Sequence, residues 1–455
     1  MKTVIGLEIH NQLASESKLF CACPTKGYRT APANSLICPS CLSQPGSKPW
    51  GINAKAVGNV LKIALALNCK IILDKPVFVQ RKHYIYPDLA SGYQRTSKPI
   101  GENGELAGVK IREVHVEEDP GQYDLRTGEV NYNRSGVPLV EIVTDPDFTS
   151  ADHARRFLEE LSAILDYLGA RRSEPGSMRV DANISIEGHP RIEVKNINSF
   201  KGVLTALTFE EARQKNLVKH GAQYGQETRH FDEKRGITIG LRKKESVDDY
   251  RYFPDPDVPP MVIGEKLVEK IRRGLPELPA QKRERFVRHY NVTGEEAFAI
   301  CLEKEYADAF EEIAKDGGAK QAANFMRGVV KKQLNYRDLA YRDSKLTVKT
   351  ISELLAMLEK KEITEKVAEK LLIDFLDKGL DPRKNAEKEG LLGIHGSQEL
   401  EAIVERVISE NKKPVEDFRK GKAEALHFLA GQVMKLTKGK ASPREVREML
   451  EKRLK

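Results

Sequence analysis

VIGLEIHNQL, residues 4–13, alternates apolar and polar side chains over most of its length. Such alternation is typical of a β-strand, because successive side chains in a strand point to opposite faces of the sheet. One face of this strand would carry the apolar residues Ile5, Leu7, Ile9 and Leu13. The other face would carry Glu8, His10 and Gln12. The segment therefore predicts a sheet with one buried face and one polar face.

Two later segments, residues 177–186 and 191–196, repeat this pattern, and the turn Glu187-Gly188-His189-Pro190 can join them into a hairpin. Their polar positions are Arg179, Asp181 and Asn183 in the first segment and Arg191, Glu193 and Lys195 in the second. A polar face is usual for a half-solvated sheet. Carboxylates mixed with cationic and amide side chains on three strands would also suit magnesium ligation beside nucleotide phosphates. Both interpretations stay open at this point.

The rest of the chain indicates an α+β fold, because β-like segments dominate up to about residue 260 and helical patterns follow. Short turns between the strands favour a mostly antiparallel sheet over a doubly wound one. We expect a catalytic domain over residues 1–290, a helical domain over 291–396 and a small helical domain over 397–455. The expected helices include residues 297–314, 321–334, 347–360 and 363–377. The glycine-rich residues 377–396 would form a linker, and the last helix would begin at Ser442-Pro443-Arg444-Glu445.

Four of the six cysteines fall within residues 21–41, at Cys21, Cys23, Cys38 and Cys41. Two close pairs separated by a short loop can place four thiolates around one zinc ion, and an all-sulfur site of this kind would be closed and structural. The alternative is four unrelated free cysteines. Cys69 and Cys301 lie in apolar helical contexts, where we expect them to be small core residues.

The charge of the chain and its first residues bear on its binding partners and its location in the cell. The formal net charge is +8, and residues 401–455 hold fourteen Lys or Arg against nine Asp or Glu. A basic tail is either a solvated surface or a contact for nucleic acid. No apolar run approaches the roughly 20 residues that span a bilayer. Since the first residues also lack the pattern of a signal peptide, we expect a cytoplasmic protein without membrane contact.

Two loops carry further candidate groups. HVEEDPG, residues 115–121, holds three adjacent carboxylates, which require either full solvation or a cation. NYNRSG, residues 131–136, offers amides and an arginine that suit phosphate contact. Either segment could also be an ordinary polar loop. The chain has no phosphate-binding P-loop, no dinucleotide fingerprint and no nucleophile elbow, so a protein that uses ammonia here would obtain it from a partner.

Taken in order, these segments closely resemble the B subunit of the bacterial tRNA-dependent amidotransferase. The likeness covers essentially the whole chain, through residues 6–10, 21–41, 81–89, 115–121, 132–139, 178–185, 193–200, 226–229, 249–254, 431–435 and 439–443. The resemblance implies a glutamine-hydrolysing carbon–nitrogen ligase of three subunits. An amidase A subunit would release ammonia, and a small C subunit would tether the assembly. The tail would bind the misacylated tRNA(Gln) or tRNA(Asn).

The B subunit of this family uses ATP and magnesium to phosphorylate the side-chain carboxylate of Glu-tRNA(Gln) or Asp-tRNA(Asn), and ammonia then displaces the phosphate. Its sheet resembles that of glutamine synthetases. By match to the family's motifs, one magnesium ion would be held by Glu8, His10 and Glu118, and a second by Glu117, Asp181 and Glu193. The phosphate groups of ATP and of the acyl phosphate would be bound by Asn133, Arg134, Arg179 and Lys195. Ammonia would enter beside Lys82, Tyr84 and Tyr86.

The sequence departs from the family's pattern at four positions. His83 stands where we expect Asn, Asn11 where we expect Val, Pro120 where we expect Ala, and Gln122 where we expect Lys. A competing hypothesis is a zinc-stabilised tRNA-binding scaffold without a phosphoryl-transfer site of its own. The related E-type subunit carries an inserted domain, for which this chain is too short. The choice between Glu-tRNA(Gln) and Asp-tRNA(Asn) is open.

Overall fold

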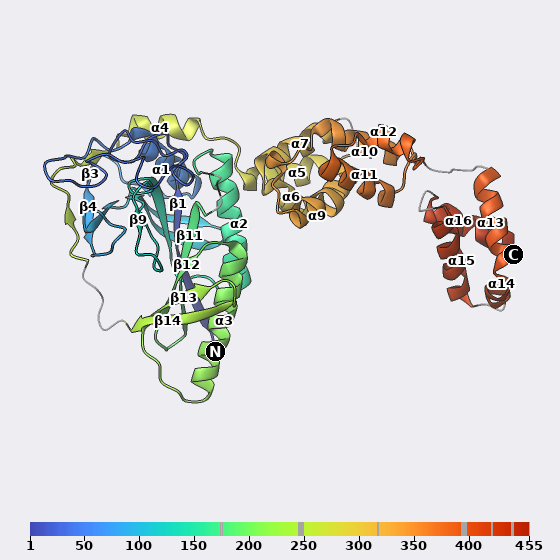
Figure 1. Ribbon diagram of the computed structural model, residues 1–455, viewed down its shortest axis with the longest axis horizontal. Coiled ribbons are helices and arrows are strands. Elements are labelled where there is room, and N and C mark those ends of the chain that lie inside the picture. Colours follow the sequence, from blue (N-terminus) through green and yellow to red (C-terminus); the bar gives the residue numbers. More distant parts are fainter. Residues whose placement is uncertain are drawn as a thin grey trace. The chain divides into compact units, whose positions relative to one another are not determined.

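The computed structural model describes residues 1–172, 174, 176–243, 250–315, 318–392, 398–419, 422–437 and 441–454. The chain forms two compact units, Met1–Pro279 and Ala280–Lys455 (Figure 1). The domain boundaries expected at 290 and 396 stay predictions. Five residues of the motifs and the linker named above lie outside the described residues, namely Asp249, Gly393, Gly396, Gly439 and Lys440. Within the described ranges, no helix has the length and apolar character needed to cross a membrane.

A twelve-stranded sheet forms the centre of the first unit, with the main order β14-β13-β12-β11-β1-β10-β7-β5-β4-β15 and with β2 and β6 beside it. Its neighbouring strands are antiparallel except for β12 and β13, which confirms the expected mostly antiparallel sheet. The strands are β1 Thr3–Gln12, β2 Lys70–Ile71, β4 Val79–His83, β5 Tyr93–Ser97, β6 Gly101–Leu106, β7 Val109–Glu118, β10 Pro138–Thr144, β11 Met178–Ile186, β12 Ile192–Ile197, β13 Glu227–Asp232, β14 Ile237–Lys243 and β15 Phe253–Pro254. Two small sheets pair β3 Pro76–Val77 with β16 Met261–Val262, and β8 Gln122–Tyr123 with β9 Val130–Asn131.

Strand β1 lies between β10 and β11, and its apolar side chains are buried as predicted. Ile5, Leu7 and Ile9 belong to one hydrophobic core with residues of the helices α1 Ala54–Ala66, α2 Ala151–Tyr167 and α3 Phe200–Lys219. Figure 1 shows α2 and α3 running along the sheet. The predicted hairpin of β11 and β12 is confirmed, although Arg191 precedes β12 and is exposed. Because the helices cover one face, the polar side chains of β1 are left on the other.

Helices make up most of the rest of the described chain. They are α4 Glu265–Arg273, α5 Pro279–Tyr290, α6 Gly294–Cys301, α7 Lys304–Ala314, α8 Ala319–Phe325, a π-helical turn Met326–Val330, α9 Lys331–Tyr336, a 3₁₀ turn Tyr341–Asp343, α10 Val348–Glu359, α11 Glu365–Lys378, α12 Pro382–Lys388, α13 Gln398–Glu410, α14 Lys412–Arg419, α15 Ala423–Leu436 and α16 Pro443–Leu454. The second unit contains two hydrophobic cores, one between Phe286 and Leu391 and the other between Leu400 and Leu454. The predicted start of the last helix is confirmed at Pro443.

Two predictions of secondary structure were wrong, one of a helix and one of a linker. The segment 297–314 is two helices, because Glu303 is extended and accepts a hydrogen bond from the Tyr341 backbone N–H at 2.8 Å. The expected linker contains α12 instead. Helix α11 ends at Gly379, whose φ of 70° is left-handed, and Asp381 caps α12 by accepting from the Lys384 N–H at 3.0 Å. Glycine and proline here mark helix ends rather than an unstructured connection.

Candidate active site

The polar face of the sheet brings together side chains that are far apart in the sequence. Strand register places Glu8 of β1 opposite Asp181 of β11, and His10 opposite Glu141 of β10. Asn183 of β11 lies opposite Glu193 of β12. Antiparallel neighbours with matching side-chain direction lie about 5 Å apart. The face therefore collects carboxylates from several adjacent strands.

A first cluster consists of His10, Glu117 and Glu141, whose potential ligand atoms all lie within 4.8 Å of one another. His10 Nε2 is 3.4 Å from Glu141 Oε1 and 3.6 Å from Glu117 Oε2. Burial and the charge of Glu141 raise the pKa of Glu117 to about 7. Burial alone would lower the pKa of His10, but the hydrogen bond and charge of Glu141 raise it to about 9. The cluster concentrates negative charge in a buried position.

A second cluster consists of Glu8, Asp181 and Glu193, again with ligand atoms within 4.8 Å of one another. Asn183 donates to Glu8 Oε1 at 3.1 Å. Lys195 Nζ lies 3.0 Å from Glu193 and 3.5 Å from Asp181. Burial, together with the charges of Glu141 and Asp181, raises the pKa of Glu8. Lys195 thus lies within ion-pair distance of two of the three carboxylates.

Both clusters fit a hard divalent cation. Their donors are carboxylate oxygens and one imidazole nitrogen, and magnesium and manganese prefer such ligands. Burial is the largest cause of the raised pKa values of Glu8 and Glu117, and repulsion from neighbouring carboxylates adds to it. A divalent cation at each cluster would remove that repulsion.

The structure groups the predicted ligands differently from the two sets that the sequence led us to expect. Glu117 and Glu118 are neighbours in β7, so their side chains point to opposite faces of the sheet. Glu118 contacts Arg95, with Nη1 at 3.4 Å, and does not lie with Glu8 and His10. Glu141 takes its place in the first cluster and was missed. The available signal was a lone carboxylate within the apolar strand PLVEIVT.

The predicted phosphate-binding residues divide into two groups. Arg179 and Arg134 converge on the buried Asp119, at 2.5 Å and 3.5 Å from its Oδ1. Asp119 also accepts from Gln12 at 2.6 Å, so Gln12 is covered rather than exposed. The two arginines lower the pKa of Asp119 although burial alone would raise it. Asn133 points elsewhere, since its side chain is fully buried against residues 32–36.

Of the residues predicted at ammonia entry, Lys82 and Tyr84 lie beside the first cluster. The charges of Glu117 and Glu141 raise the pKa of Lys82 against the effect of burial. Tyr84 donates to Gln94 at 3.4 Å, and Gln94 donates to Glu117 at 3.3 Å. Tyr86 is instead half exposed and contacts the Tyr123 ring.

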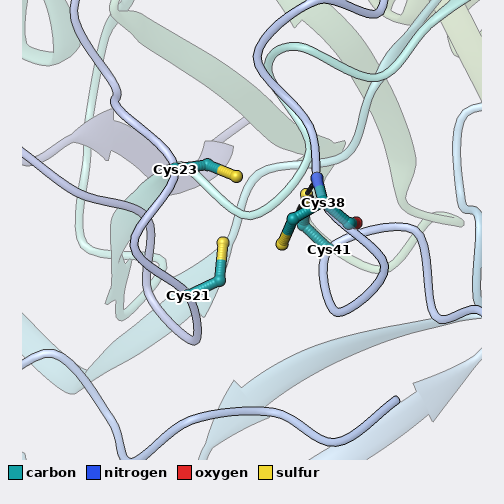
Figure 2. Close-up of side chains that lie close together, drawn as sticks. All are labelled: Cys21, Cys23, Cys38 and Cys41. Carbon is teal, nitrogen blue, oxygen red and sulfur yellow. Dashed lines mark hydrogen bonds between the residues drawn. The ribbon is translucent and has the colours of Figure 1, made fainter. Parts of the chain in front are cut away.

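The four predicted knuckle cysteines form one cluster (Figure 2), with sulfur atoms within 4.8 Å of one another. Figure 2 shows Cys21 and Cys23 on one segment facing Cys38 and Cys41 on another. The Cys38 and Cys41 sulfurs are 3.9 Å apart. Tetrahedral zinc with bonds of about 2.3 Å places its sulfur ligands about 3.8 Å apart. Cys69 and Cys301 are buried outside the cluster, as expected.

Two family models match the chain, the GatB/GatE catalytic domain over residues 3–269 and the GatB domain over residues 308–454. The B subunit of the aspartyl/glutamyl-tRNA(Asn/Gln) amidotransferase from Methanobrevibacter smithii is 51% identical over 450 residues, covering 99% of both chains. The chain belongs to the family of amidotransferase B subunits. The B subunit from Methanothermobacter thermautotrophicus is 51% identical over 449 residues, covering 99% of both chains. That from Methanocaldococcus jannaschii is 46% identical over 467 residues, covering 100% of this chain and 98% of its own.

The match to the B-subunit family extends through both units, so the resemblance seen in the sequence is confirmed. The catalytic-domain model spans the sheet, both carboxylate clusters and the cysteines. The GatB-domain model spans helices α8 to α16. The polar face therefore lies in the part of the family that its model describes as catalytic.

Proposed function

We propose that this protein activates the side-chain carboxylate of Glu-tRNA(Gln) or Asp-tRNA(Asn) with ATP, within a glutamine-hydrolysing amidotransferase. Membership of the family makes the chain one component of a tRNA-dependent amidotransferase, and its relatives carry both tRNA species in their names. The observation that carries the finer proposal is the pair of carboxylate clusters on one sheet face. The mostly antiparallel sheet also supports a glutamine-synthetase-like catalytic domain.

The reaction requires activation because a carboxylate is a poor electrophile. The carboxylate oxygen would attack the γ-phosphorus of ATP, forming a new P–O bond and breaking the bond to ADP. Ammonia would then attack the acyl carbon, and the C–O bond to phosphate would break. The products are the amide, inorganic phosphate and a proton. Positioning and charge stabilisation supply most of the catalysis in such phosphoryl transfers.

Different residues of the polar face would bind the metal ions and the phosphate groups. His10, Glu117 and Glu141 would hold one magnesium ion, and Glu8, Asp181 and Glu193 a second. Bound magnesium offsets the negative charge of the phosphate oxygens. Lys195 and Arg179 would orient and neutralise phosphate groups, while Asp119 keeps Arg179 and Arg134 in place. Glu118 is left out of both sites because it pairs with Arg95.

Ammonia would come from an amidase A subunit, with a small C subunit in the same assembly. Lys82 and Tyr84 lie beside the first cluster, where ammonia must meet the activated carboxylate. Tyr86, half exposed, would lie on the outer part of that route. The four cysteines would hold one structural zinc ion. Asn133 would act indirectly, by fixing the loop that bears Arg134.

The experiment is tRNA-stimulated ATP hydrolysis by the assembled complex. Wild-type complex should form ADP when Glu-tRNA(Gln) or Asp-tRNA(Asn) is added, and comparing the two decides the substrate. Glu8→Gln should reduce this stimulation by about 100-fold and leave glutamine hydrolysis and tRNA binding intact. Glu105→Gln, at an exposed position of β6, is the matched control. Full transamidation by an assembled Glu8→Gln complex would favour a zinc-stabilised tRNA-binding scaffold instead.

The tail would contact the tRNA. Its helices α13 to α16 enclose a hydrophobic core, and most of the described arginines there are paired with carboxylates. Lys412 and Lys413 at the start of α14 are exposed and have no carboxylate within ion-pair distance among the described residues. Replacing both with Ala should weaken tRNA binding and reduce the slope of log affinity against log salt by about 1.5. An unchanged slope would overturn this assignment.

A further inference from the structure

Lys18 is buried beside the cysteine cluster. It is 1% exposed, and it ranks among the largest fully buried side chains. Its Nζ donates to the Leu36 carbonyl at 2.9 Å and the Tyr132 carbonyl at 3.4 Å, and lies 3.5 Å from Cys41 Sγ. Among the residues that the structure describes, no carboxylate lies within ion-pair distance of this ammonium.

A buried ammonium without an anion is costly. Removing such a charge from water costs several kcal/mol unless an opposite charge and hydrogen bonds replace the solvent. The two carbonyls supply hydrogen-bond acceptors but no net charge. Four neutral thiols would supply none either. Thiolates would, because zinc bound to four thiolates has two negative charges left over.

We propose that Lys18 is the charge-compensating residue of the zinc knuckle, with its ammonium stabilising a tetrathiolate zinc centre through Cys41. The inference rests on the zinc ion in the proposed function. It goes beyond that ion by explaining why a lysine is buried in this position. Groups that contact the ligands of a metal commonly change its affinity by about 10- to 100-fold when they are removed.

The same lysine connects the knuckle to the loop of residues 131–136, which carries Arg134. Its ammonium bridges Cys41 and the carbonyl of Tyr132, two residues before Arg134. Asn133 fastens the loop further, because it accepts from the Leu36 N–H and donates to the Pro32 carbonyl, each at 2.8 Å. The backbone N–H of Leu19 donates to the Gly136 carbonyl at 2.8 Å. Loss of zinc would therefore loosen the loop that presents Arg134 to Asp119.

The test is the rate at which a chelator removes zinc from the full-length protein, followed with a zinc-sensitive dye. Wild-type protein should contain about one zinc per chain. Lys18→Met keeps the apolar stem and removes the charge, and it should release zinc about 10- to 100-fold faster. Lys18→Arg should restore slow release. Lys26→Met, at an exposed lysine of the same segment, should release zinc at the wild-type rate.

Lys18→Gln is the second variant should Lys18→Met fail to fold, because it removes the charge and keeps hydrogen-bond donors on a slightly shorter side chain. Wild-type release rates in either folded neutral variant would overturn the inference while leaving the zinc proposal standing. Equal acceleration in Lys18→Arg would also overturn it, since the charge would then not be the cause. Zinc-free wild-type protein would overturn both the zinc proposal and the inference.

Discussion

The first unit contains two kinds of candidate metal site, and they differ in donor atoms and in origin. The knuckle offers four sulfurs from residues 21–41. The polar face offers oxygens and one imidazole from residues that run from Glu8 to Glu193. Sulfur suits a closed structural zinc site, whereas oxygen suits magnesium and its phosphate ligands. Donor chemistry therefore distinguishes a candidate structural site from a candidate reaction site within the same unit.

The two sites also differ in how their charge is balanced. At the knuckle a buried lysine faces the sulfurs. On the polar face, five carboxylates lie near cations that include His10, Lys82 and Lys195, and the pKa values of Glu8 and Glu117 are raised, whereas that of Glu141 is lowered. Glu210 of α3 provides a contrast within the same unit. It is fully buried, yet Arg213 and Arg229 accompany it and its pKa is lowered.

The largest effect should follow from Glu141→Gln, which removes a carboxylate of the first cluster and keeps its shape. We expect transamidation by the assembled complex to fall by about 100- to 1000-fold, the usual cost of losing one group that stabilises transition-state charge. The magnesium concentration for half-maximal rate should rise as well. Rates measured over a magnesium series check this.

Glu118→Gln tests whether Glu118 belongs to the metal site, because Glu118 points away from the clustered carboxylates and contacts Arg95. Its magnesium dependence should stay close to that of wild type. If Glu118→Gln raised the magnesium concentration for half-maximal rate as much as Glu141→Gln, Glu118 would have to be a metal ligand.

Glu210→Gln should lower the free energy of unfolding by about 3 kcal/mol at neutral pH, because it removes the fully buried one of the two carboxylates, Glu210 and Glu227, that Arg213 and Arg229 share. Burial alone would raise the pKa of Glu210, but hydrogen bonds from Arg213 and Thr238 lower it below the ordinary 4.5. The carboxylate therefore contributes stability above pH 4.5, and this contribution is lost as pH falls through its lower native pKa. Denaturant unfolding of both proteins from acidic to neutral pH measures the difference, which should shrink once the pH falls below the ordinary glutamate pKa. A constant gap would contradict the assignment.

Asn11→Val should have the smallest effect and the opposite sign. Asn11 is 0% exposed, and neither polar atom of its side chain has a hydrogen-bond partner among the described residues. Its strand neighbours are Val140 and Met178. Removing an unsatisfied buried amide should stabilise the first unit by about 1 kcal/mol. The measurement is the thermal midpoint, and a lower midpoint in the variant would show that the amide is satisfied in solution.

The sequence predicted most where the signal is local. The cysteine pairs, the alternation in β1 and the turn between β11 and β12 each depend on residues close together, and each prediction was confirmed. The grouping of ligands depends on register between β1, β7 and β10, which no local pattern contains. Glu141 was missed for that reason. Both Glu117 and Glu118 were predicted to be metal ligands, although strand geometry points their side chains to opposite faces of the sheet.

Tertiary contacts explain the other differences. The break before α7 depends on a hydrogen bond between Glu303 and Tyr341, which are distant in the sequence. Asn133 looked like a phosphate ligand because of its polar loop, but its partners lie in residues 32–36. A polar residue in a loop indicates that its side chain forms hydrogen bonds. It does not show whether the partner is a ligand or another part of the protein.

The most direct test of the central claim is anomalous scattering from crystals of the complex soaked in manganese, which replaces magnesium at oxygen-rich sites. Two manganese peaks are predicted on the polar face. One should lie about 2 Å from ligand atoms of His10, Glu117 and Glu141, and the other about 2 Å from those of Glu8, Asp181 and Glu193. A face without peaks would contradict the account, and so would a peak coordinated by Glu118.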